Sequence, residues 1–142
     1  MGPIGAAVAV LLVLSGCAHA PSQEMSDARR AIRAAVEAGA REDASWTLAR
    51  AEEAMVVAGA ALERGDYDFA SRHAGSAARN AHSSRRIALA IQSARTAINT
   101  VAPDEELQGV YERALDAAAK GNEADALAFA NAVRVAVKSG TR

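Results

Sequence analysis

Residues 67–101, YDFASRHAGSAARNAHSSRRIALAIQSARTAINTV, contain the longest helical pattern in this 142-residue chain. Apolar residues recur there every three or four positions, which is the spacing that places side chains on one face of a helix. The series comprises Ala70, Ala74, Ala77, Ala81, Ile87, Ile91, Ala94, Ile98 and Val101. At 1.5 Å per residue such a helix is about 50 Å long. The stretch therefore predicts one long central helix.

The same spacing continues on both sides of this stretch. It predicts further helices over residues 24–38, 43–64, 104–120 and 123–138. Val, Ile and Thr never cluster as a strand requires, whereas alanine, the best helix former, is abundant throughout. We therefore expect an all-α protein, in which residues 24–142 form an antiparallel helical bundle of about five helices.

Stop and start residues mark the ends of these helices. Glycines suited to the left-handed position after a helix stand at Gly39, Gly65 and Gly121. Candidate N-cap residues for the following helices are Asp43, Asp66 and Asn122. Pro103 separates the third helix from the fourth. Residues 61–74 and 117–130 share one pattern of helix end, glycine turn and alanine-lined helix, which indicates either an internal repeat or two similar alanine-rich hairpins.

The N-terminal residues have a different character. Residues 4–14 are almost wholly apolar, but they are fewer than the roughly 20 that a membrane-spanning helix needs. A short apolar stretch followed by small residues is typical of a secretory signal peptide, although the usual basic residue near its start is missing. We therefore expect residues 1–16 to be a signal peptide and 17–23 to be a short linker.

The sequence Leu14-Ser15-Gly16-Cys17 resembles the lipobox of bacterial lipoproteins and holds the only cysteine of the chain. The resemblance implies cleavage between Gly16 and Cys17, a diacylglyceryl group on the Cys17 sulfur and a fatty acyl chain, such as palmitate, on the new amine. Ala18 stands where the family's inner-membrane retention signal has Asp. This implies an outer-membrane lipoprotein facing the periplasm of a Gram-negative cell. The alternative is an unused thiol in an ordinary signal peptide.

A second resemblance covers residues 27–95. Its motifs are Gly39-Ala40, Leu48 with Ala51, and Gly65-Asp66-Tyr67 with Ala70. With these motifs the segment is similar to the bacterial periplasmic DUF4398 (domain of unknown function) family, whose Ala-Pro appears here as Ala44-Ser45. Many relatives carry a C-terminal OmpA-like domain that binds peptidoglycan; this chain is too short for one, so that activity is not carried over. The Gly-Asp-Tyr turn also resembles part of a tetratricopeptide repeat, but the spacing is not kept over consecutive repeats.

No arrangement of side chains in the sequence is typical of catalysis. His73 and His82 lie nine residues apart, which places them on opposite faces of the long helix. The spacing of Cys and His residues offers no metal site, and there is no glycine-rich phosphate loop. We therefore expect neither an enzyme nor a bound cofactor or metal ion.

One charge pattern predicts a binding surface. No acidic residue stands between Asp68 and Asp104, while Arg72, Arg79 and Arg86 follow one another at intervals of seven. Such a stripe suits phosphates, anionic glycans or an acidic protein face. The alternative is that the acids of residues 104–125 pair with these arginines inside one molecule.

The length of the fourth helix discriminates between these two interpretations. Residues 104–120 span about 25 Å, half the length of the third helix. Folded back from Pro103, they reach Arg95, Arg86 and at most Arg85, and they leave Arg72 and Arg79 uncovered.

Two functional classes follow from these features. The first is a structural or protein-interaction module, held at the membrane by its lipid anchor, that binds an envelope protein or an anionic glycan. The alternative is a periplasmic carrier or accessory subunit with a lipid or hydrophobic ligand between its helices. The net charge of −1 gives no support to nucleic-acid binding. We expect a monomer or a weak homodimer.

Overall fold

We describe a computed structural model of residues 21–102 and 104–140. These residues form six helices and no strand, which confirms the all-α prediction. The helices are α1 (Ser22–Glu37), α2 (Ala40–Asp43), α3 (Ser45–Glu63), α4 (Tyr67–Ile98), α5 (Glu105–Ala119) and α6 (Glu123–Gly140). The five predicted helices agree with α1, α3, α4, α5 and α6 to within three residues at each end.

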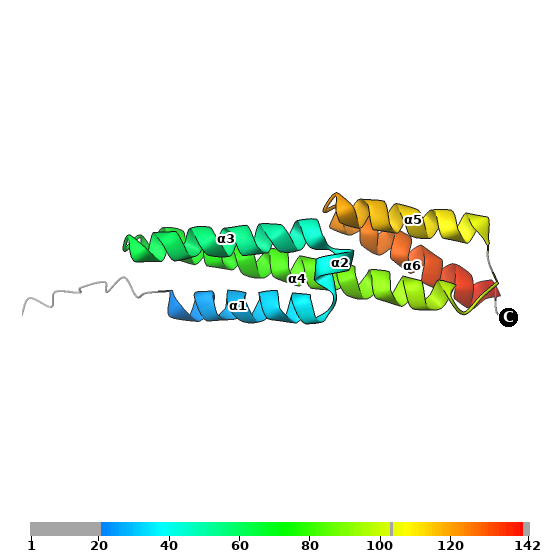
Figure 1. Cartoon of the computed structure of the whole chain (residues 1–142), viewed down its shortest axis with the longest axis horizontal. Helices are drawn as coiled ribbons and strands as arrows, with labels where there is room; N and C mark the ends of the chain where they lie inside the picture. Colours follow the sequence, from blue (N-terminus) through cyan, green and yellow to red (C-terminus); the bar gives the residue numbers. More distant parts are fainter. Residues whose placement is uncertain (1–20, 103, 141–142) are drawn as a thin grey trace, which may run out of the picture.

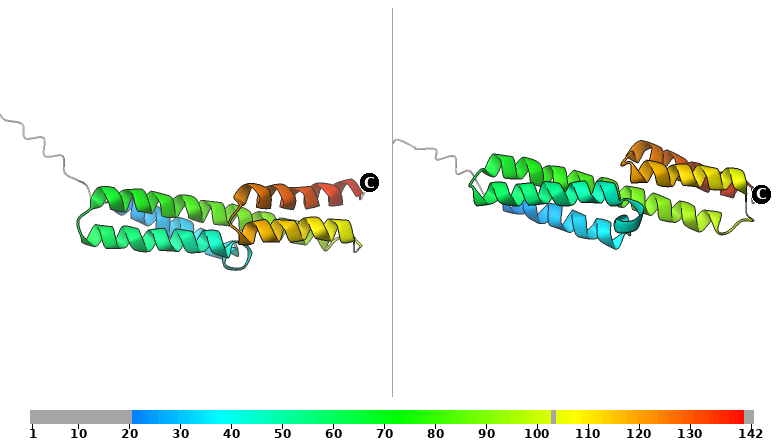
Figure 2. Two further views of the ribbon diagram at one scale, coloured as in Figure 1. Left: turned by 90° about the horizontal axis from the view of Figure 1, so that it is seen from above. Right: turned by 45° about the horizontal axis from the view of Figure 1, so that its top comes forward.

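The helices are arranged as two three-helix bundles placed end to end, with α4 running through both (Figure 1). Helices α1 and α3 pack along the first half of α4, and the α5–α6 hairpin packs along its second half. Both further views in Figure 2 show the same division. The long helix predicted from residues 67–101 is therefore the element that the two bundles share.

The predicted helix 43–64 begins two residues too early, because α3 begins at Ser45. Ala44 has φ −153° and interrupts the helix, so that the short α2 precedes α3 and raises the number of helices to six. Asp43 does not cap α3, because its carboxylate is bound by Arg95 of α4 instead. The first turn of α3 has no side-chain cap. A contact with a residue 52 positions away thus replaces the expected local one.

The turns α3–α4 and α5–α6 have the same hydrogen-bond pattern. Gly65 and Gly121 have positive φ, at 75° and 71°, as predicted for the residue after a helix. In the first turn the Asp66 N–H donates to the Ala61 carbonyl at 3.0 Å, and in the second the Asn122 N–H donates to the Ala117 carbonyl at 2.9 Å. The pattern shared by residues 61–74 and 117–130 is therefore also shared by the backbone.

Two of the predicted caps are present in these turns. The Asp66 carboxylate accepts a hydrogen bond from the Phe69 N–H at 3.1 Å, and Asn122 accepts one from the Asp125 N–H at 3.3 Å. Each cap satisfies one backbone donor at the start of a helix. Pro103, the other predicted boundary, lies outside the described residues.

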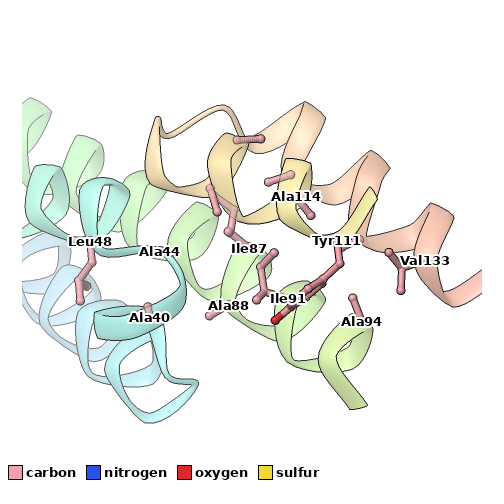
Figure 3. Packing of buried hydrophobic residues seen from close by; sticks show 14 of the residues in the cluster. Ala40, Ala44, Leu48, Ile87, Ala88, Ile91, Ala94, Tyr111, Ala114 and Val133 are labelled. Carbon is pink, nitrogen blue, oxygen red and sulfur yellow. The ribbon is translucent and has the colours of Figure 1, made fainter. Parts of the chain in front are cut away.

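The two bundles have different cores. The first is lined mainly by alanine, which lets helix axes approach closely but buries little apolar area. The second contains the largest fully buried apolar side chains, Ile87, Ile91 and Val133. Figure 3 shows Ile87 and Ile91 pointing from α4 into the space between the helices, with Tyr111 of α5 reaching across to α4. This core is continuous with Leu48 of the first bundle, so the bundles share one hydrophobic cluster.

Candidate functional site

The arginine stripe lies on the face of α4 that points away from α1 and α3. In the first half of α4 the fully buried residues are Ala70, Ala74, Ala77 and Ala81. Arg72, Arg79 and Arg86 are all exposed on the other side of the helix. Seven residues correspond to nearly two helical turns, so the three side chains stand almost in line.

Arg86 is the end of this stripe and is paired within the molecule. Its Nη2 lies 2.5 Å from one carboxylate oxygen of Glu123, and the Ser83 hydroxyl donates to the other oxygen at 2.5 Å. Glu123 is the first residue of α6. The intramolecular pairing expected for Arg86 is present, but the acid comes from α6 and not from the predicted fourth helix. The pair marks the place where α6 begins to cover α4.

Arg72 and Arg79 lie beyond the reach of α6. Within residues 21–102 and 104–140, neither side chain forms an ion pair. The Arg72 guanidinium carbon lies 5.7 Å from the centre of the Phe69 ring, in a cation–π arrangement. Arg79 passes close to Gly75, where an added Cβ would lie 3.4 Å from its Nη1. Two exposed guanidinium groups therefore remain available for an anion.

A shallow groove runs beside this stripe, between α3 and α4. Its volume is about 210 Å³, and it opens to solvent. The residues that line it are Arg50, Glu53, Ala54, Val57, His73, Ser76 and Asn80. Arg50 lies over the ring of Trp46, with its guanidinium carbon 5.1 Å from the ring centre. Arg50, His73, Ser76 and Asn80 can donate hydrogen bonds, whereas Glu53 is an acid and Ala54 and Val57 are apolar, so the groove is of mixed polarity.

Sequence reasoning did not include Arg50, Trp46 or Asn80 in this surface. The spacing of Trp46 and Arg50, four residues apart on a helix, was a signal for their contact. Nothing local to α3 shows that this contact lies beside His73 of α4, because the pairing of the two helices is a long-range feature. The groove was therefore not predictable from the periodicity of either helix alone.

The remaining expectations concern the lipid anchor, membrane-spanning helices and metal sites. Cys17, with Leu14, Gly16 and Ala18, lies outside the described residues. In the described part of the chain no helix is long and apolar enough to cross a membrane. No group of three His, Cys, Asp or Glu side chains comes together there in a way that suits a metal ion.

Comparison with known proteins places most of this structure in one family. A family model described as a domain of unknown function (DUF4398) matches residues 23–105. No curated protein and no solved structure matches the chain. The matched residues comprise nearly all of α1, all of α2 to α4 and the first residue of α5, so the α5–α6 hairpin lies beyond them. Because the match covers more than half of the chain and includes residues 27–95, the chain belongs to the DUF4398 family.

Proposed function

We propose that this protein is a lipid-anchored helical interaction module of the bacterial cell envelope, which binds an anionic partner through the arginine stripe. The lipobox-like sequence Leu14-Ser15-Gly16-Cys17 supports the anchor, and Ala18 supports an outer-membrane position facing the periplasm. Only a few residues separate Cys17 from Ser22, where α1 begins. The anchored protein therefore holds its first bundle close to the bilayer.

The observation that carries the proposal is the difference between the two halves of α4. In the second half, α6 covers the helix and Glu123 neutralises Arg86. In the first half the corresponding face is bare, and Arg72 and Arg79 have no acidic partner among the described residues. Unpaired, exposed arginines on a rigid helix form a preorganised surface for carboxylates or phosphates.

The alternative of a hydrophobic-ligand carrier has weaker support. Such a carrier requires a cavity beside residues 87–101, whereas Ile87, Ile91 and Ala94 are fully buried in contact with other core residues. The two hollows at the end of this region are open grooves around Val101 and Ala102 that are also lined by Asp104. Open grooves of this kind do not shield a lipid chain from water.

The test compares two double variants of the full chain that carry the same change in charge. Arg72→Gln with Arg79→Gln removes the unpaired part of the stripe. Arg85→Gln with Arg134→Gln is the matched control, because both arginines are exposed, form no ion pair with any described residue and lie off the stripe. Each variant is used to capture proteins and glycans from detergent-solubilised envelopes at low and high salt.

We expect the stripe variant alone to lose the salt-sensitive captured material, while its melting temperature stays close to that of the wild type. Salt matters because exposed charges are screened over about 10 Å at 0.1 M ionic strength. Equal capture by wild type and the stripe variant at low salt would show that the stripe is only a solvated face. Equal losses in both variants would show a non-specific effect of net charge.

A further inference from the structure

A second open surface lies on another side of the first bundle. Helices α1 and α3 both pack along α4 but contact each other much less (Figure 1). They leave a groove of about 480 Å³ between them. The walls of this groove are mainly apolar. The residues that line it are Met25, Arg29, Ile32, Arg33, Glu52, Met55, Val56 and Gly59.

The α3 side of this groove is unusually apolar for a surface. Val56 is 73% exposed, the largest exposed fraction among the exposed large apolar residues in the described part of the chain. One turn further, an added Cβ at Gly59 would meet nothing within 4 Å, so the backbone there is open to an approaching helix. Exposed apolar side chains beside an uncovered backbone favour the docking of another helix.

The two rims of the groove carry opposite charges. The α1 rim has Arg29 and Arg33, neither of which forms an ion pair within the described ranges. The α3 rim has Glu52, whose only ion pair among these residues is a long one to Arg41, at 3.6 Å. A surface with one basic and one acidic rim is complementary to a copy of itself.

We propose that a second copy of this chain covers the groove, in a two-fold dimer whose axis runs parallel to the helices. That axis places α1 of each subunit over α3 of the other. Helices α1 and α3 run antiparallel, so Arg33 and Glu52, the groove residues of each helix nearest to α2, lie at the same end of the groove. Each Arg33 then faces the partner's Glu52, and Val56 is covered by the partner's α1.

The charges disfavour the antiparallel alternative. An axis perpendicular to the helices would place α1 over the partner's α1, so that Arg29 and Arg33 would face the same two residues of the other copy. Like charges in contact are unfavourable. The parallel arrangement also leaves both N-termini at the same end, as two anchors in one membrane require; this last point rests on the proposed function.

Cross-linking of single-cysteine variants tests the arrangement. The full chain is prepared in detergent with Cys17→Ser as the background, which leaves no other cysteine. Arg29→Cys and Val56→Cys chains are co-expressed with different tags, so that a disulfide between positions 29 and 56 of differently tagged chains joins two subunits. Arg29→Cys with Leu89→Cys is the control pair, because Leu89 is exposed on α4 in the second bundle, away from the groove.

We expect the 29–56 pair to form a cross-linked dimer, and Arg29→Cys alone or the control pair to form almost none. Cross-linking of Arg29→Cys with itself would overturn the parallel arrangement. Absence of any 29–56 product, with the chain still folded by circular dichroism, would overturn the dimer.

Exchange of the two charges tests the proposed contact between Arg33 and the partner's Glu52 in the same cross-linking assay. Arg33→Glu and Glu52→Arg should each lower 29–56 cross-linking about tenfold at low salt, because two symmetry-related contacts become repulsive. The double variant restores opposite charges and should recover most of the product. Failure of the double variant to recover, with melting temperatures unchanged, would overturn the proposed pairing.

Arg72→Gln with Arg79→Gln should leave cross-linking unchanged, because these residues lie outside the groove. The failure of the dimer proposal is therefore distinguishable from the failure of the proposed anionic binding surface.

Discussion

Arg95 of α4 forms an ion pair with Asp43 of α2, and this contact joins the two bundles. The Asp43 side chain is only 4% exposed, and the Arg95 Nε also donates to the Tyr111 hydroxyl of α5 at 3.0 Å. The hydrogen bond to Asp43, and then the one to Tyr111, raise the pKa of the Arg95 guanidinium above its ordinary value. Because the pKa of Arg95 is raised in the folded state, the stabilisation from its contacts with Asp43 and Tyr111 is complete at every pH below the ordinary pKa of arginine. Arg95 is therefore charged, and this stabilisation is present, throughout the physiological pH range.

Asp43→Ala should therefore lower the free energy of unfolding by about 1–2 kcal/mol, because it leaves Arg95 without its acidic partner. The loss is moderate since the Arg95 side chain is 42% exposed and water partly replaces the carboxylate. Urea unfolding measures it. Asp116→Ala is the control, since it removes the exposed Lys120–Asp116 pair and should cost at most about 0.5 kcal/mol. Equal effects of the two variants would contradict a special role for Asp43.

Gly121 should tolerate a side chain much less well than Gly65. Both have positive φ, but a Cβ at Gly121 would lie 2.1 Å from the Trp46 ring, whereas one at Gly65 would meet nothing within 4 Å. Gly65→Ala should cost about 1 kcal/mol from backbone strain alone. Gly121→Ala should cost about 2–4 kcal/mol, because the ring must also move away.

Fluorescence distinguishes these two causes, since Trp46 is the only tryptophan of the chain. Trp46 is already 46% exposed, so Gly121→Ala should shift the emission to longer wavelength as the ring loses its contact with the turn, and Gly65→Ala should leave the spectrum unchanged. An unshifted spectrum for Gly121→Ala would show that the ring does not have to leave its place against the turn.

Ile91→Ala should destabilise the protein by about 2–5 kcal/mol, because Ile91 is completely buried between α4 and the α5–α6 hairpin. Ile98→Ala should cost less, since Ile98 is only partly buried at the edge of the same cluster. Leu89→Ala, at a side chain that is 44% exposed, is the control and should change stability least. Thermal unfolding of the three variants gives the order; any other order would contradict the packing around α4.

Cys17→Ala should prevent lipid attachment, so that the protein either remains unprocessed or leaves the membrane fraction. Two or more acyl chains give a stable anchor, at about 0.8 kcal/mol per buried CH₂, whereas one chain binds only marginally. Fractionation of cells and the mass of the protein measure the result. Normal processing and membrane retention of the variant would contradict the lipobox interpretation.

The helices of this protein were predictable because helix propensity, apolar spacing and capping act over a few residues. The glycines after α1, α3 and α5 end these helices through their own backbone freedom, and Asp66 caps α4 from an adjacent position. The outward position of Arg72 and Arg79 follows from the same spacing, since their side of α4 has no apolar series. Membership of DUF4398 was likewise visible in local motifs of residues 27–95.

The roles of charged residues depended instead on contacts between distant parts of the chain. Asp43 has the sequence context of a cap, yet the fold places it beside Arg95, and Arg86 finds Glu123 of α6 instead of an acid of α5. An alanine-rich face accepts several neighbouring helices almost equally well, so its periodicity does not specify which helix covers it. That choice is made by the packing of a few large side chains and turns, such as Tyr111 over α4 and Trp46 against Gly121, which local patterns do not encode.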